Sequence, residues 1–177
     1  MKNLALAQLI PISIVLLLMG ACERESQNLT PLGEDIFTAI EINRLPDSLA
    51  LKDTVYVPIY SDIYSQTKES RYKLTATLSL RNTSLKYPIF ISAVDYYNSA
   101  GPLTKHFLEK PIVLNEMESI EYVIEEQDIS GGTGANFVIY WAAENQNVLP
   151  IFEGIMISTY GQQGISFSTK GVSISGR

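Results

Sequence analysis

From residue 54 onward, the apolar positions of the chain repeat with a period of two. In the stretch RYKLTATLSLRNT, every second position from 74 to 80 is apolar and the positions between them are polar. In the segment 119–125, Ile120, Tyr122 and Ile124 alternate with intervening residues that include the acids Glu121 and Glu125. Such alternation is typical of strands that bury one face and expose the other. The segment 87–97 is apolar on both faces, which predicts a central strand.

Further apolar runs are separated by clusters of Gly, Asn, Ser and Pro, which favour turns. The runs lie at 137–143, 151–160, 165–167 and 172–174, and the clusters at 82–84, 98–102, 130–134, 144–147 and 160–164. No stretch after residue 52 has sustained helical periodicity. We therefore predict an all-β domain, an immunoglobulin-like antiparallel β-sandwich of about seven to nine strands. Trp141, the single tryptophan, is expected in the core between the two sheets.

The first 21 residues have the layout of a secretory signal peptide. Lys2 precedes an apolar run that ends in small residues, and Cys22 follows directly. The sequence LMGAC at 18–22 resembles the bacterial lipobox, although Met19 stands where Leu is usual. This resemblance implies that Cys22 is lipidated and becomes the mature N-terminus, anchored in the cell membrane or the outer membrane by its acyl chains. The alternative is an uncleaved membrane-spanning helix.

These features divide the chain into three parts. Residues 1–21 are the expected signal peptide, 22–52 the lipidated cysteine with a polar tether, and 53–177 the β-sandwich. An alternative is that part of the tether packs on the domain. Glu23, directly after the cysteine, does not clearly match an inner-membrane retention signal, which favours an outer-membrane destination. The domain is then expected to face the periplasm or the cell surface.

Charge and composition narrow the classes of partner. The formal net charge is −6, and Lys and Arg form no cluster. Nucleic acid is therefore not expected as a partner, because phosphate binding requires grouped cations. Cys22 is the only cysteine, so the domain has no disulfide to stabilise it. The expected partners are the membrane, through the anchor, and an envelope protein.

The sequence offers little for catalysis. His106 is the only histidine, and no GxSxG motif is present. One histidine without a free cysteine does not make a zinc site. The acids Glu125, Glu126 and Asp128 lack the frame of a calcium loop, so a solvated acidic surface is the expected interpretation. We predict neither an enzyme nor a bound cofactor or metal.

Asp95 lies inside an apolar run, and an unpaired buried carboxylate is costly. Arg81, which ends the preceding predicted strand, is the expected partner in a structural ion pair. The alternative function is a hydrolase that acts on carbohydrate or peptidoglycan with acids such as Asp95, Glu121 or Glu125. That function requires two carboxylates to converge in one cleft.

The stretch SGGTGANFVIYW at 130–141 holds three glycines, Gly131, Gly132 and Gly134, followed by Asn136. A phosphate loop requires a Lys and a helix after its glycines, but a β-branched and aromatic run follows here. A turn or bulge before a strand is therefore expected. The alternative is a nest of amides that binds an anion, which leaves a metal- or anion-binding carrier as a third possible function.

Tyrosines are abundant, with ten in the chain, and clustered tyrosines make good recognition surfaces. Strands of a sandwich also carry tyrosines for packing, so both interpretations remain open at this point. A rigid sandwich usually binds through its loops, and the contact surface is expected there or at a sheet edge.

Several stretches carry a family resemblance. They are VYVPIYSDIY (55–64), TATLSLRNTS (75–84), VDYYNSAG (94–101), GGTGANF (131–137) and GISFSTKG (164–171). Together they resemble the bacterial domain-of-unknown-function family numbered 3124, over about residues 54–174. The resemblance implies a small exported protein or lipoprotein, and it offers no catalytic residues to carry over. Our expectation is a lipid-anchored envelope protein that acts as a non-enzymatic binding or assembly module.

Overall fold

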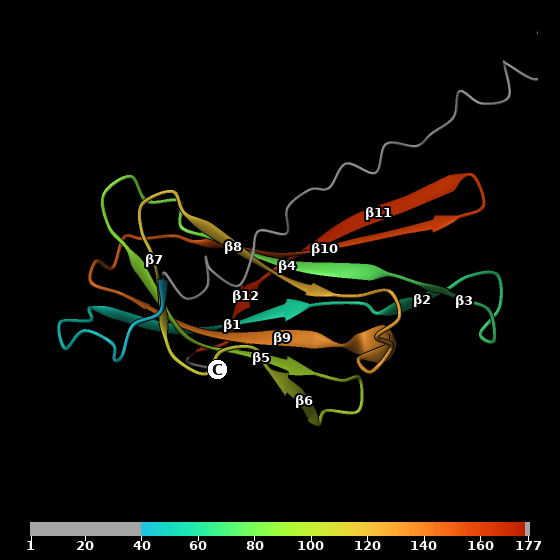
Figure 1. Ribbon diagram of the computed structural model, residues 1–177, viewed down its shortest axis with the longest axis horizontal. Helices are drawn as coiled ribbons and strands as arrows, with labels where there is room; N and C mark the ends of the chain where they lie inside the picture. The colour runs from blue at the N-terminus through green and yellow to red at the C-terminus, as the bar shows by residue number, and fades with distance from the viewer. Residues whose placement is uncertain (1–39, 176–177) are drawn as a thin grey trace, which may run out of the picture. The chain divides into compact units, whose positions relative to one another are not determined.

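The computed structural model describes residues 40–175. This part of the chain contains strands and one short 3₁₀ turn, η1 (Figure 1). The elements are β1 (Leu51–Pro58), β2 (Asp62–Tyr64), β3 (Arg71–Lys73), β4 (Thr75–Arg81), β5 (Ile89–Tyr97), β6 (Leu103–His106), β7 (Ile112–Leu114), β8 (Ser119–Ile124), η1 (Gly132–Gly134), β9 (Asn136–Ala143), β10 (Ile151–Tyr160), β11 (Gln163–Lys170) and β12 (Val172–Ser173).

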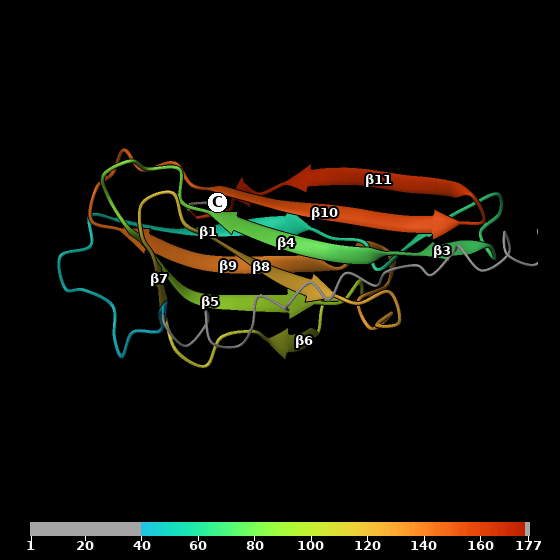
Figure 2. The ribbon, with the colours of Figure 1, turned by 45° about the horizontal axis from the view of Figure 1, so that its top comes forward.

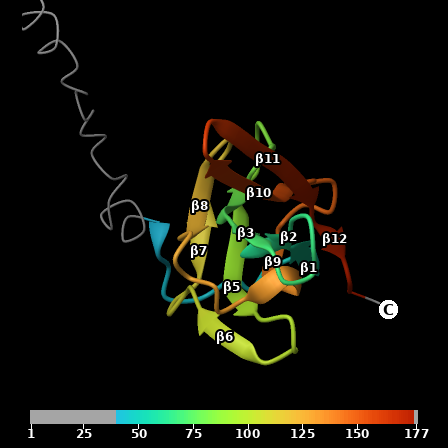
Figure 3. The same ribbon diagram turned by 90° about the vertical axis from the view of Figure 1, so that its right-hand side faces the viewer.

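Two antiparallel sheets form the domain. The six-stranded sheet has the order β12-β1-β9-β5-β6, and β7 also pairs with β5. The four-stranded sheet has the order β11-β10-β4-β8, and β2 and β3 form a separate hairpin. Figure 3 views the strands end-on, and Figure 2 shows β11 at the outer edge of its sheet. The predicted all-β sandwich is confirmed.

The alternation in the sequence corresponds to the two faces of the sheets. In β8, Ile120, Tyr122 and Ile124 are buried, whereas Ser119, Glu121 and Val123 are exposed. Strand β5 is central as predicted, because it pairs with β9 along one side and with β6 and β7 along the other. Burial of one apolar face of each sheet is the main stabilising contribution in such a fold.

Aromatic side chains link the two sheets. Trp141 of β9 is 6% exposed and packs edge-on against Phe152 of β10, with ring centroids 5.9 Å apart. The prediction that Trp141 lies between the sheets is therefore confirmed. Nearer the other end, Phe107 contacts Phe137 of the six-stranded sheet at 5.5 Å and Tyr122 of the four-stranded sheet at 5.2 Å.

Short strands explain why the count differs from the prediction. Within residues 40–175, seven strands have six or more residues and five have only two to four. A run of two to four residues is too short for alternation to be visible in the sequence. The predicted number of about seven to nine therefore corresponds to the longer strands.

The end of the predicted tether contacts the domain. Glu41 forms an isolated bridge with Ile112, Ile42 N donates to Pro111 O at 2.8 Å, and Lys110 pairs with Glu41 at 3.0 Å. Residues 40–42 thus pack on the sandwich, in agreement with the alternative interpretation that part of the tether packs on the domain. The predicted signal peptide and Cys22 lie outside the described residues. Among residues 40–175, no helix has the length and apolar character needed to cross a membrane.

Candidate functional site

A carboxylate and a histidine form a pair on the outer face of the six-stranded sheet. Asp95 of β5 lies directly opposite His106 of β6. The Asp95 Oδ1 and His106 Nδ1 atoms are 2.8 Å apart, and the side chains are 12% and 67% exposed, respectively. The carboxylate is therefore largely covered, while the histidine that contacts it reaches solvent.

The prediction that Asp95 pairs with Arg81 is wrong. Arg81 ends β4 in the other sheet, where its Nε lies 3.0 Å from Ser79 Oγ and 3.8 Å from Glu153 Oε1. Strands β4 and β5 follow each other in the chain, but the connection between them crosses from one sheet to the other. Arg81 and Asp95 thus belong to different layers. Proximity in sequence was a poor guide here because consecutive strands do not always pair.

Tyrosines surround this pair on the same face. Residues directly opposite each other in antiparallel strands project to the same side of a sheet, and Tyr56, Val138, Asp95 and His106 form such a row across β1, β9, β5 and β6. Tyr97 lies two residues beyond Asp95, and Tyr140 lies two residues beyond Val138. We call this surface the tyrosine face; it comprises Tyr56, Asp95, Tyr97, His106, Asn136 and Tyr140.

The tyrosine face is partly open to solvent. Tyr140 is 38% exposed, and Tyr56, Tyr97 and Asn136 are half-buried. Burial raises the pKa of the Tyr97 phenol, and the nearby Asp95 and Tyr140 raise it further.

A hollow of about 310 Å³ adjoins the Tyr140 end of this face. Its lining includes Lys52, Thr54, Ser92 and Tyr140. The Ser92 hydroxyl donates to the Tyr140 carbonyl at 3.2 Å, beside an irregularity in the pairing of β5 and β9 between Ile91 and Ala93. Such bulges often re-aim side chains next to functional sites.

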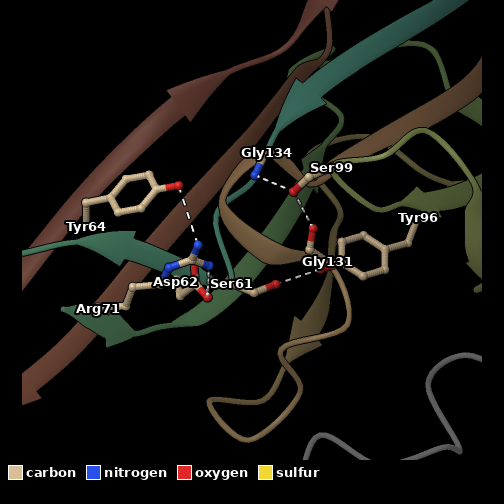
Figure 4. Close-up of polar contacts among 8 residues, drawn as sticks. All are labelled: Ser61, Asp62, Tyr64, Arg71, Tyr96, Ser99, Gly131 and Gly134. Atoms are coloured by element: carbon tan, nitrogen blue, oxygen red, sulfur yellow. Dashed lines mark hydrogen bonds and ion pairs between the residues drawn. The ribbon is translucent and has the colours of Figure 1, made fainter. Parts of the chain in front are cut away.

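The glycine loop has the geometry of a packed turn (Figure 4). Gly132 has φ +71, which favours glycine, and its N–H donates to Ile129 O at 3.2 Å. The Gly134 N–H donates to Ser99 Oγ, and that hydroxyl donates to Gly131 O, both at 2.8 Å. The amides of Gly132 and Gly134 thus have separate acceptors inside the protein and do not converge on one point.

Gly131 is required by a close approach. A Cβ at this position would lie 1.8 Å from the hydroxyl oxygen of Tyr96. That hydroxyl forms a buried 2.8 Å hydrogen bond with Ser61 Oγ (Figure 4). Glycine therefore allows the loop to cover a buried polar pair at the end of the sandwich. Asn136, which opens β9 after the loop, lies opposite Tyr97 on the tyrosine face.

The other acids named from the sequence lie elsewhere. Glu121 projects from the exposed face of β8 in the four-stranded sheet. Asp128 belongs to a turn in which its N–H donates to Glu125 O at 2.9 Å. Within the described part of the chain, no three His, Cys, Asp or Glu side chains gather closely enough to hold a metal ion.

A second hollow, of about 410 Å³, lies among the loops around residues 83–87 and 145–149. Three of its polar side chains are already hydrogen-bonded to backbone groups. Ser84 Oγ accepts from the amides of Lys86 and Tyr87, Asn145 Oδ1 accepts from Asn147 N, and Thr83 Oγ1 donates to Leu149 O. Because these groups already have partners, we place the candidate site on the tyrosine face instead.

Sequence reasoning missed both the Asp95–His106 pair and an ion pair in the β2–β3 hairpin. In the hairpin, Arg71 Nη1 lies 3.2 Å from Asp62 Oδ2, and the guanidinium lies 4.8 Å from the Tyr64 ring centroid (Figure 4). The NSAGP turn at 98–102 was the available signal for the first pair. A hairpin closed by that turn brings the residues around 95 and 106 opposite each other.

Comparison with known proteins identifies the family of this chain. No curated protein matches the chain. A crystal structure of Thermotoga maritima 1070 resembles it with 11% sequence identity and a TM-score of 0.38, over 68% of this chain and 92% of that chain. A structural similarity at this level supports no conclusion about this chain. The model of the family DUF3124, described as a protein of unknown function, matches residues 52–174. The chain therefore belongs to the DUF3124 family.

Proposed function

We propose that this protein is a lipid-anchored, non-enzymatic binding module of the bacterial envelope, and that it binds its ligand through the tyrosine face. The leader at 1–21 and the lipobox-like LMGAC at 18–22 support the anchor. The rigid sandwich supports a binding role, because strands hold side chains more firmly than loops do.

The observation that carries the proposal is the position of Asp95. Its row neighbours on the inner strands include Val138, and its side chain is only 12% exposed. An apolar residue at this position would avoid the cost of desolvating a carboxylate. Polar residues that break a local packing rule are concentrated at functional sites. The partner of Asp95 is an exposed histidine, so the pair remains accessible to a ligand.

The placement of the other acids supports binding over hydrolysis. A glycosidase holds its two carboxylates roughly 5 to 10 Å apart. Asp95 faces outward from the six-stranded sheet, whereas Glu121 faces outward from the four-stranded sheet. The two layers of the sandwich lie between them. The alternative of an anion carrier gains no support from the glycine loop, whose amides at Gly132 and Gly134 are bonded internally.

Photo-crosslinking in cells tests this function. The photoreactive residue p-benzoylphenylalanine replaces Tyr140 in one full-length protein and Val123 in a control. Val123 is 51% exposed on the outer face of the other sheet. We expect a discrete envelope adduct from position 140 and none from position 123. Equal labelling from both positions, or none from position 140, would contradict the proposed binding face.

A further inference from the structure

Beneath the centre of the tyrosine face, β9 and β5 are paired on both sides, whereas β6, which carries His106, is the edge strand of the sheet. Strand β9 lies between β1 and β5, and β5 lies between β9 and β6. An extended peptide usually binds by adding a strand to an open sheet edge. Asp95, Val138 and Tyr140 are on internal strands, so a ligand over this central part of the face contacts side chains rather than strand main chain.

The face is broad and combines aromatic and polar groups. Neighbouring strands lie about 4.8 Å apart, so the row from Tyr56 through Asp95 to His106 spans roughly 14 Å across three such spacings. Tyr97 and Tyr140 lie on either side of that row. Each tyrosine presents an apolar ring together with a hydroxyl, so the surface contacts C–H groups and O–H groups at once.

The polar atoms of this face are rich in acceptors. The Asp95 Oδ1 atom contacts His106 Nδ1. The other carboxylate oxygen, Oδ2, is left to accept from a ligand. When the imidazole donates from Nδ1, its Nε2 also accepts. The phenol hydroxyls of Tyr97 and Tyr140 and the amide of Asn136 both donate and accept. This inventory fits a ligand that carries several hydroxyl donors.

The charge of the chain and of the tyrosine face favours neutral ligands over anionic ones. The chain has a net charge of −6, and the centre of the face is the Asp95 carboxylate. Among the residues that line the adjoining hollow, Lys52 is the only cation. A polyanion would need a cluster of cations to offset the repulsion. A ligand without net negative charge fits this surface better.

We infer that the tyrosine face binds a neutral glycan chain, an inference that rests on the proposed function of this face. A pyranose ring has an apolar C–H side and a rim of hydroxyls. The C–H side packs against the tyrosine rings, and the rim hydroxyls donate to Asp95 Oδ2 and His106 Nε2. The roughly 14 Å row accommodates more than one sugar ring, so a chain is bound rather than a single sugar.

Calorimetry on the full-length protein tests this inference. The detergent must lack a sugar head group, because such a group would compete for the face. The probes are cellohexaose, maltohexaose and the hexaose of N-acetylglucosamine, with oligogalacturonate as an anionic comparison. We expect saturable binding of at least one neutral probe and weaker binding of oligogalacturonate.

Variants locate the binding site. Tyr140→Ala is expected to weaken binding by about tenfold or more, as for a central aromatic contact. Tyr140→Phe keeps the ring and is expected to retain most of the affinity. Tyr64→Ala is the matched control, because Tyr64 is 54% exposed on the β2–β3 hairpin, away from the face. It should leave binding unchanged. Emission from Trp141 verifies that every variant is folded.

The outcomes separate this inference from the proposed function. No heat with any neutral probe, tighter binding of oligogalacturonate, or binding that survives Tyr140→Ala combined with Tyr97→Ala overturns the glycan inference. If position 140 then still crosslinks selectively to an envelope protein or lipid, the binding face stands and only the ligand class is wrong. If positions 140 and 123 crosslink alike, both proposals fail.

Discussion

Asp95 Oδ1 lies 2.8 Å from His106 Nδ1, so that an almost covered carboxylate is joined to a histidine that is two-thirds exposed. The histidine gives a partner to a carboxylate that is costly to bury unpaired. A hydrophobic residue in place of Asp95 would need no such partner. The position of the pair at the centre of the tyrosine face is therefore better explained by binding than by stability.

Replacing His106 by Ala separates stability from binding. We expect His106→Ala to lower the free energy of unfolding by about 1 to 3 kcal/mol, because the Asp95 carboxylate loses its partner; urea unfolding with Trp141 emission measures this loss. The same change is expected to abolish the adduct from the photoreactive residue at position 140. A loss of several kcal/mol together with an unchanged adduct would show that the pair has a structural role instead.

The glycine loop provides a test of the close packing at the end of the sandwich. In Gly131→Ala, the new methyl group meets the Tyr96 hydroxyl and displaces its buried hydrogen bond with Ser61. We expect a loss of about 2 to 4 kcal/mol in the free energy of unfolding. Gly164→Ala is the control, because a Cβ there meets nothing within 4 Å. If both variants unfold at the same urea concentration, the described packing around Gly131 is wrong.

Buried tyrosines predict that stability falls at alkaline pH. Burial raises the pKa of Tyr96 and Tyr122 above the ordinary value of about 10. Above that pH, the unfolded chain releases phenol protons that the folded chain retains, so the free energy of unfolding decreases as the pH rises. Below about pH 10 both states are protonated and this effect disappears.

Unfolding in urea between about pH 9 and pH 11 measures this decrease. The variant Tyr122→Phe removes one of the groups with a raised pKa, and we expect it to lose less stability over the interval than the unchanged chain does. An identical pH dependence in the two proteins would contradict the burial of a neutral phenol at this position.

The lipid anchor gives a prediction for the part of the chain before the domain. Replacing Cys22 by Ser removes the acylated thiol, so we expect the full-length protein to move from the membrane fraction to the soluble fraction of lysed cells. Immunoblots of the two fractions measure the distribution. If Cys22→Ser stays with the membrane, the leader acts as a spanning helix.

Much of the fold was predictable because alternation in the sequence directly reports one buried face. Strand β8, with Ile120, Tyr122 and Ile124 inward, is the clearest case. The strands of two to four residues, such as β6, are held by their neighbours rather than by a pattern of their own. Their positions depend on tertiary pairing, which a single sequence does not display.

The site was less predictable than the fold. Asp95 was recognised as an acid in an apolar run, but its partner depends on which strands pair, and that is decided by the topology. Tyrosines on the core side and on the outer face look alike in sequence. Tyr96 is 1% exposed and Tyr140 is 38% exposed, and the register of β5 and β9 is what separates packing from surface.

Co-sedimentation tests the central claim, that the tyrosine face binds an envelope component, most directly. Full-length protein carrying Cys22→Ser is mixed with isolated envelopes and pelleted, which removes the contribution of the anchor. We expect this protein to pellet with the envelopes, as does the additional control variant Tyr64→Ala. Adding Tyr97→Ala and Tyr140→Ala should leave it in the supernatant. If the protein with both changes pellets as well as the unchanged face does, the tyrosine face is not the binding surface.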